Sequence, residues 1–137
     1  MSRIYFEAKI RALLKFFKKT KHEIALTFVD DKEMARLNSL FLGKKGPTDV
    51  LSFPLDQKQN LGDIVVSLDT AKIQAGLVGV TLRELVVVLL VHGFLHLLGF
   101  DHHNKNKKNR MRKMESKLLI KLIGSDLSLI ALENKIH

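Results

Sequence analysis

Three histidines lie close together in an apolar part of the sequence: His92, His96 and His102. On an α-helix, the Cβ atoms of residues four apart are about 5–6 Å from each other, so His92 and His96 could bind one metal ion together. On a β-strand, at about 3.3 Å per residue, the same two residues would be about 13 Å apart. A shared metal ion therefore requires this segment to be helical.

The residues around the histidines carry the signals of such a helix. Thr81 and Glu84 have the spacing of a capping box, which begins a helix, and a long apolar run follows them. Gly99 can end the helix in a left-handed conformation, which lets the chain reverse its direction. The reversal would bring His102 back toward the first two histidines.

Three neutral imidazoles that leave one coordination position open are typical of a catalytic zinc site. The spacing H-x3-H-x2-G-x2-H matches the metzincin proteases, but these place a glutamate after the first histidine as general base, where this chain has Gly93. We therefore expect one zinc ion on His92, His96 and His102, with His103 as the alternative third ligand. The reaction should be hydrolysis of something other than a peptide.

The carboxylates near these histidines each have two interpretations. Asp101 could orient an imidazole or act on a metal-bound water as a catalytic group, or it could be an ordinary turn residue. Asp49 and Asp63 stand at the ends of expected strands, where they could reach the site or accept hydrogen bonds from their own turns. The sequence does not choose between these roles.

The charge balance favours a polyanionic partner, with nucleic acid first. The 137 residues include 23 Lys and Arg against 14 Asp and Glu, a formal net charge of +9, and no cysteine, which excludes disulfides and thiolate zinc sites. A basic run follows the histidines directly: Lys105, Lys107, Lys108, Arg110, Arg112 and Lys113. Near a phosphodiesterase site these cations would neutralise RNA phosphates; otherwise they form a solvated surface. Lys44 and Lys45, in a glycine loop, are a second small basic cluster and candidate catalytic cations.

The whole pattern predicts a single α+β domain over residues 1–137, with a small mixed sheet of three or four strands packed with helices around the histidine-bearing helix. Strands are expected at Ile4–Phe6, Glu23–Val29, Val50–Phe53 and Ile64–Leu68, with a turn between the last two. Helices are expected over much of residues 1–20, at Lys32–Phe41 and Thr70–Leu77, from residue 82 to Gly99, and from Lys108 onward. The apolar run is short for a membrane span and no secretory signal is visible, so we expect a cytoplasmic protein without a membrane.

Two blocks of residues resemble the YbeY family of bacterial endoribonucleases: Pro47–Pro54 with Leu61–Ile64, and His92–His102. The resemblance extends over about residues 35–120. It implies a single α+β domain with one zinc ion on the three histidines. It also implies single-strand-specific cleavage of RNA in small-subunit rRNA 3′-end maturation and ribosome quality control, with the ribosome as partner in the cytoplasm.

The chain departs from the family at Leu42, where relatives usually have an arginine that is thought to face the active-site cleft. Leucine cannot bind phosphate. Lys44, Lys45 or the basic run could replace the arginine, or the protein could cleave RNA weakly. Two alternatives therefore stay open: a metal-dependent peptidase, and a ribosome-associated RNA-binding protein with a structural or weakly active zinc site. Attack by an activated water and attack by a ribose 2′-OH are also both open.

Overall fold

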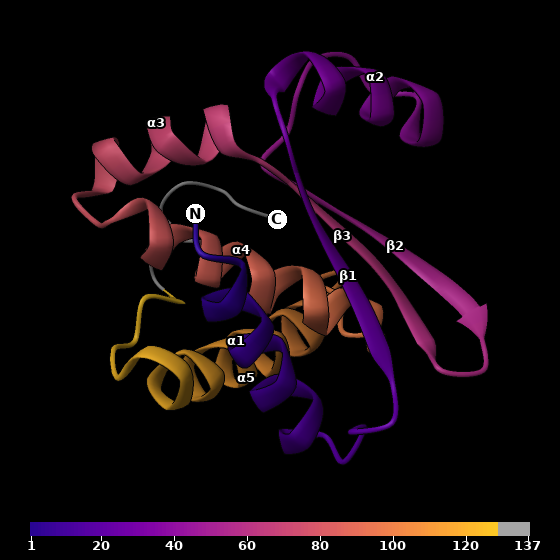
Figure 1. Ribbon diagram of the computed structural model, residues 1–137, viewed down its shortest axis with the longest axis vertical. Coiled ribbons are helices and arrows are strands. Elements are labelled where there is room, and N and C mark those ends of the chain that lie inside the picture. Colours follow the sequence, from indigo (N-terminus) through magenta and orange to yellow (C-terminus); the bar gives the residue numbers. More distant parts are fainter. Residues whose placement is uncertain (129–137) are drawn as a thin grey trace.

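The computed structural model describes residues 1–128 and has an α+β architecture (Figure 1). Its elements, in chain order, are α1 (Arg3–Phe16), β1 (Glu23–Val29), α2 (Asp31–Leu42), β2 (Val50–Gln57), β3 (Asn60–Ser67), α3 (Leu68–Val78), α4 (Leu82–Leu97) and α5 (Lys105–Ile123). The strands form one sheet in the order β1-β3-β2. The expected fold class, a small mixed sheet packed with helices, is confirmed.

The central strand β3 pairs parallel with β1 and antiparallel with β2. Successive side chains of a strand point to opposite faces of the sheet. Ile64 and Val66 therefore enter the main core, whereas Val65 enters a smaller cluster with Met34 of α2. The two faces of the sheet are thus covered by different helices.

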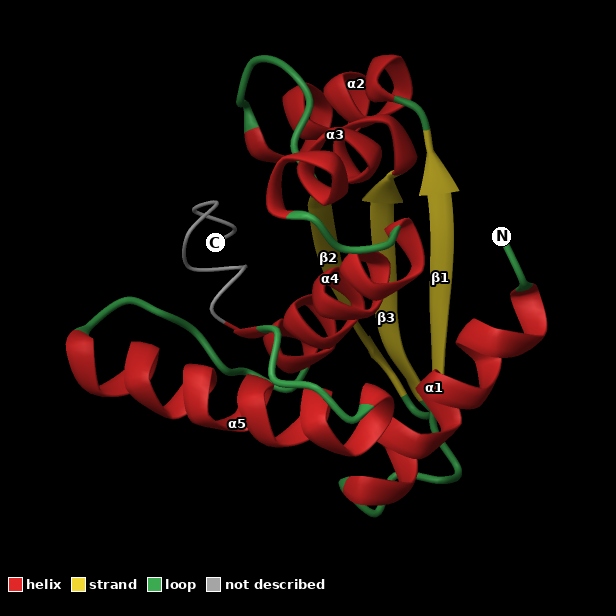
Figure 2. Ribbon diagram, turned by 90° about the vertical axis from the view of Figure 1, so that its left-hand side faces the viewer, coloured by secondary structure: helices red, strands yellow, loops and turns green. Residues whose placement is uncertain are grey.

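Helix α4 is the central helix of the domain. Thr81 and Glu84 form the expected capping box at its start, and every residue from Leu85 to Leu95 is buried. A helix that is apolar on all sides must be covered on all sides. Figure 2 shows α4 in front of β2 and β3, with α5 below it.

Because Gly93 has no side chain, the backbone of α4 packs directly against the sheet. A Cβ atom at this position would lie 3.0 Å from Ile64 Cγ2 and 3.0 Å from Ser52 Oγ. Ser52 Oγ also donates a hydrogen bond of 3.0 Å to the Gly93 carbonyl oxygen. This close contact fixes His92, the preceding residue, against β2.

Within residues 1–128, no single helix is long and apolar enough to cross a membrane. Helices α3 and α4 reach that length and composition only when taken together, and they are bent by 114° at the break between them.

The strand expected at Ile4–Phe6 is wrong, because these residues belong to α1. Ser2 is the N-cap of this helix, and its side chain accepts a hydrogen bond of 3.2 Å from the Tyr5 backbone N–H. Phe6 then lies in the core together with Leu13 and Leu14 of the same helix. Burial of one helical face outweighs the local β propensity of the aromatic residues.

The turn expected around Pro54 is also wrong, because β2 continues through this proline to Gln57. β2 is an edge strand, and a proline is tolerated at a sheet edge because no partner requires its missing N–H.

At the other end of the chain, α5 begins at Lys105 and not at Lys108, since Asn104 caps it by accepting from the Lys107 N–H. For the tail from Ser125, one further helical turn and a frayed end were both open, and residues 129–137 lie outside the described part of the chain.

Candidate functional site

His92 and His96 face each other from successive turns of α4. Their Nε2 atoms are 3.1 Å apart and their ring centroids 4.6 Å apart. In a tetrahedral zinc site with Zn–N bonds of about 2.0–2.1 Å, two nitrogen ligands are about 3.3 Å from each other. The pair therefore has the spacing of two corners of a zinc coordination sphere.

Glu115 of α5 is in contact with the opposite side of the His92 ring. Glu115 Oε2 lies 3.0 Å from His92 Nδ1, and the two side chains are only 10% and 5% exposed. An ionised carboxylate only accepts hydrogen bonds, so this contact favours the tautomer of His92 with its proton on Nδ1, in which the Nε2 lone pair is directed toward His96. This is the tautomer that a metal ligand needs.

The sequence reasoning missed this role of Glu115. The residue is 23 positions from His92, on another helix. One signal was present: Glu115 stands four residues after Met111 and three before Leu118, on the face of α5 that is otherwise apolar and buried. A carboxylate at such a position requires a buried partner.

The structure places His102 beside His96, with 5.6 Å between the ring centroids. Within residues 1–128, no three His, Cys, Asp or Glu side chains are already close enough together to hold a metal ion. The first two expected ligands are thus brought together, and the role of His102 as the third stays a prediction. His103 is 79% exposed, its ring centroid is 6.3 Å from that of His102, and its Nδ1 lies 3.8 Å from Asp101 Oδ1.

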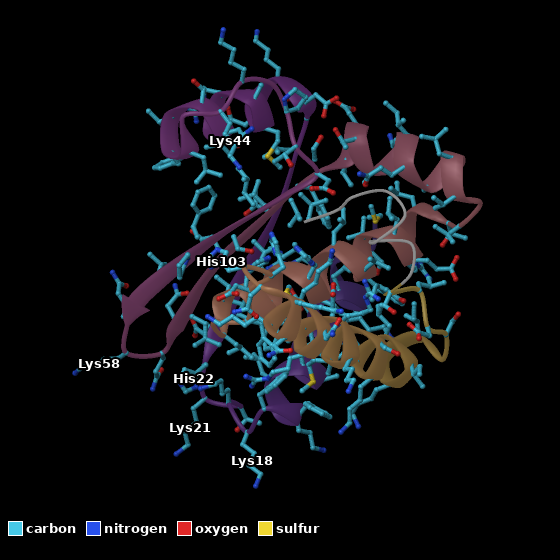
Figure 3. All side chains as sticks on the ribbon, turned by 180° about the vertical axis from the view of Figure 1, so that it is seen from behind. Lys18, Lys21, His22, Lys44, Lys58 and His103 are labelled. Carbon is cyan, nitrogen blue, oxygen red and sulfur yellow. The ribbon has the colours of Figure 1, made fainter. Side chains whose placement is uncertain are left out.

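A cleft of about 340 Å³ opens at the first two histidines. It is lined by Leu42, Lys44, Val50, Leu51, Ser52, Pro54, His92 and His96. Both Lys44 and Lys45 are exposed, but only Lys44 lines the cleft. In Figure 3, Lys44 lies beside α2, far from Lys18, Lys21 and His22 at the opposite end of the molecule.

The aspartates have local partners. Asp101 Oδ1 accepts a hydrogen bond of 3.0 Å from the His103 backbone N–H, which, with the nearby Lys107, holds the pKa of Asp101 below its ordinary value. Asp49 is buried and accepts from the backbone N–H of Val50 at 2.7 Å. Asp63 lies inside β3 and does not line the cleft. Asp101 is thus held within its own loop, and its catalytic role stays a prediction, whereas Asp49 also accepts a hydrogen bond of 3.3 Å from Gln74 Nε2 of α3.

The position of the peptidase glutamate is tightly packed. It is occupied here by Gly93, where a Cβ atom would lie 3.0 Å from Ile64 Cγ2 and 3.0 Å from Ser52 Oγ, so that these neighbours would have to shift. A glutamate side chain would require a larger rearrangement. The site therefore combines metal-ligand chemistry with a cleft that contains a lysine, and it lacks the general base of a zinc peptidase.

The chain matches known proteins over nearly all of its described length. The model of the family described as endoribonuclease YbeY matches residues 2–123. The endoribonuclease YbeY of Sulfurihydrogenibium sp. is 45% identical over 106 residues, which cover 73% of this chain and 70% of that protein. That of Acholeplasma laidlawii is 39% identical over 118 residues and 85% of each chain. A solution structure of a Thermotoga maritima protein superimposes with a TM-score of 0.67 at 26% identity, over 90% of this chain and 86% of that one.

Proposed function

The chain belongs to the YbeY endoribonuclease family, and we propose that it cleaves single-stranded RNA with the help of one zinc ion bound at the α4 histidines. Family membership confirms the expected class of enzyme, a nuclease. The observation that most strongly supports metal dependence is the 3.1 Å separation of the Nε2 atoms of His92 and His96 at the cleft.

His92, His96 and His102 would hold the ion. When bound, zinc would supply Lewis-acid polarisation of a phosphoryl oxygen and a water of lowered pKa. Glu115 keeps the proton of His92 on Nδ1, so that Nε2 is available as a donor. The ring of His96 lies between those of His92 and His102, at centroid distances of 4.6 and 5.6 Å.

Lys44 would bind the phosphate of the substrate in this cleft. It lies in the same cavity as the two histidines, and a cation next to a transferring phosphoryl group stabilises the negative charge that develops there. Leu42 lines the cavity as well, 50% exposed, and offers an apolar contact to a base or ribose. Asp101 would hold the turn that contains His102, because its Oδ1 accepts a hydrogen bond from the His103 N–H.

We further propose that the substrate is the 3′ end of small-subunit rRNA, and that the protein acts with the ribosome in the cytoplasm, in rRNA maturation and quality control. The net charge of +9 supports a polyanionic partner. The residues Pro47–Pro54 and His92–His102 support the family role.

The test is cleavage of a single-stranded RNA and of the same sequence as a duplex, by wild-type protein and His96→Ala purified in parallel. The expected result is zinc-dependent cleavage of the single strand that a chelator stops and that His96→Ala lacks. Equal cleavage by both preparations would point to a contaminating nuclease and contradict the proposal. A substrate with one 2′-deoxyribose at the cleaved position separates the two routes, because only attack by the 2′-OH requires that group.

Leu42 favours a second candidate function, an RNA-binding protein with a weakly active metal site. A leucine at the cleft offers no charge to a phosphate, and Lys44 alone would have to supply it. If His92→Ala abolished zinc binding while rRNA processing in cells stayed intact, binding would be the function. If rRNA processing failed while the variant still bound RNA normally, catalysis would be the function.

A further inference from the structure

Two cavities lie along α5, outside the histidine cleft. The first, about 180 Å³, is lined by Leu98, Gly99, Phe100, Asp101, Lys107 and Arg110. The second, about 230 Å³, is lined by Phe100, Arg110, Lys113, Met114 and Lys117. Because they share Phe100 and Arg110, they form one surface, called here the α5 groove. None of its residues lines the histidine cleft.

The α5 groove is strongly cationic. Lys107, Arg110, Lys113 and Lys117 are three or four residues apart and therefore lie on one side of the helix. Lys107 pairs with Asp101, the acidic residue of the groove, at 3.7 Å, whereas within residues 1–128 neither Arg110 nor Lys113 forms an ion pair with a carboxylate. The first turn of α5 has no acidic residue, so the positive end of the helix dipole adds to the lysine charges there. An anionic ligand would reduce the electrostatic repulsion among these cations.

Phe100 gives the groove an aromatic surface. It packs against the main core, remains half-exposed, and lines both cavities. An aromatic ring beside a row of cations is how proteins bind single-stranded nucleic acid, with a base on the ring and phosphates on the cations. Each cavity is smaller than the roughly 300–1,000 Å³ typical of a pocket for a whole small molecule, which suits one part of an extended ligand.

We propose that the α5 groove is a second RNA-binding subsite, which holds a nucleotide that flanks the cleavage position. The base lies against Phe100, and Arg110 and Lys113 bind phosphates. The connection between α4 and α5 supplies both His102 and four of the groove residues, so one strand can pass from the histidine cleft to the groove. This proposal rests on the proposed function, and the subsite would explain how the enzyme selects single-stranded RNA.

Binding can be measured without cleavage, by fluorescence anisotropy of a labelled twelve-nucleotide single-stranded RNA in chelator at several salt concentrations. The variant is Arg110→Ala with Lys113→Ala. The control is Arg11→Ala with Lys15→Ala, which removes the same charge from exposed positions of α1. Each phosphate contact to a single strand adds about 0.7 to the slope of log Kd against log salt, so the groove variant should lose about 1.4. The control should keep the wild-type slope, and equal losses in both variants would overturn the proposal.

The aromatic contact has its own test. Phe100→Leu keeps an apolar side chain of similar length and should weaken single-stranded RNA binding about tenfold, because a stacked base is lost. The affinity for duplex RNA, whose bases are already stacked, should not change. Thermal unfolding identifies any loss that comes from misfolding. Equal weakening for both RNAs in a folded variant would overturn the role of Phe100.

Kinetics separate this subsite from the reaction itself. On a three-nucleotide RNA, too short to reach the groove, Arg110→Ala with Lys113→Ala should have wild-type kcat/KM, and on the longer RNA it should have a raised KM at unchanged kcat. If no preparation cleaves RNA, the proposed nuclease fails while the anisotropy still decides the groove. If cleavage is normal and the groove variant binds like wild type, the subsite alone fails.

Discussion

The buried side chains of His92 and Glu115 meet across the contact between α4 and α5, with 3.0 Å between Nδ1 and Oε2. The pair connects the helix that bears the first two histidines with the helix that bears the basic run. It also orients the ring so that Nε2 faces His96, and a carboxylate at this position favours the tautomer with its proton on Nδ1.

Replacing Glu115 should therefore weaken metal binding. Partners of this kind contribute about 10–100-fold in metal affinity, so Glu115→Leu should raise the zinc dissociation constant by that factor, and Glu115→Gln, whose amide oxygen still accepts from Nδ1, should raise it less. Competition with a chromophoric chelator measures the constant, and ¹⁵N chemical shifts of the imidazole report the tautomer. Glu7→Leu, a partly exposed carboxylate on α1, is the control. Wild-type affinity and tautomer in Glu115→Leu would show that the contact is only structural.

Gly93→Ala should destabilise the fold, although alanine is the better helix former. The new methyl group would lie 3.0 Å from Ile64 Cγ2, and Ile64 is fully buried, so its shift would disturb the surrounding core. We expect the free energy of unfolding to fall by about 1 kcal/mol after the helical gain of alanine is deducted. Gly76→Ala in α3 is the matched control, because nothing lies within 4 Å of its Cβ, and it should stabilise by about 0.5–1 kcal/mol. Urea unfolding compares both, and a stabilised Gly93→Ala would contradict the close packing.

Lys44 and Lys45 are adjacent in sequence and should differ in function. Only Lys44 lines the histidine cleft. Lys44→Ala should therefore weaken RNA binding and reduce its salt slope by about 0.7, the loss of one phosphate contact, while Lys45→Ala should change neither. Anisotropy titrations at three salt concentrations are sufficient. Equal effects of the two substitutions would mean that the loop contributes only general charge.

Asp31, at the start of α2, should make the free energy of unfolding depend on pH in the acid range, through its contacts with the start of α3. Hydrogen bonds of 2.5 Å from Ser67 Oγ and 2.6 Å from Thr70 Oγ1 lower the pKa of Asp31 in the folded state. A lowered folded pKa stabilises the protein above the unfolded value of about 3.9, and this contribution is lost as the pH falls from there through the folded pKa. We expect Asp31→Asn to cost about 1 kcal/mol at pH 7 and much less at pH 2.

Unfolding by urea at both pH values measures the difference. Thr70→Val, which removes one donor hydroxyl and keeps the shape of the side chain, should give a smaller effect with the same pH dependence. A cost for Asp31→Asn that is equal at pH 7 and pH 2 would show that the carboxylate charge does not contribute.

The helix that presents the histidines was predictable because its signals are local. The capping box of Thr81 and Glu84, the apolar run and the four-residue spacing of His92 and His96 all fall within one element. The parallel pairing of β1 with β3 and the contact of Glu115 with His92 depend on how distant elements pack, which no local pattern contains. The same holds for Lys44 against Lys45, where only the path of the loop decides which of them reaches the cleft.

The wrong expectations have equally specific causes. The sequence predicts a turn at Pro54, but the place of Pro54 in β2 depends on that strand being at the sheet edge, which is a property of the whole topology. Ile4–Phe6 has β-forming residues but follows Ser2, and the serine cap together with the buried face of α1 decides for a helix. In both cases tertiary packing outweighed local propensity.

The central claim is that the imidazoles of His92, His96 and His102 bind one zinc ion together. The most direct measurement is the zinc stoichiometry and affinity of the metal-stripped protein, compared with His92→Ala, His96→Ala, His102→Ala and His103→Ala. The account predicts one zinc ion per wild-type chain, unchanged binding in His103→Ala, and losses in the other three variants larger than the loss in Glu115→Leu. Wild-type affinity in His102→Ala, or no zinc bound by the wild-type chain, would contradict it.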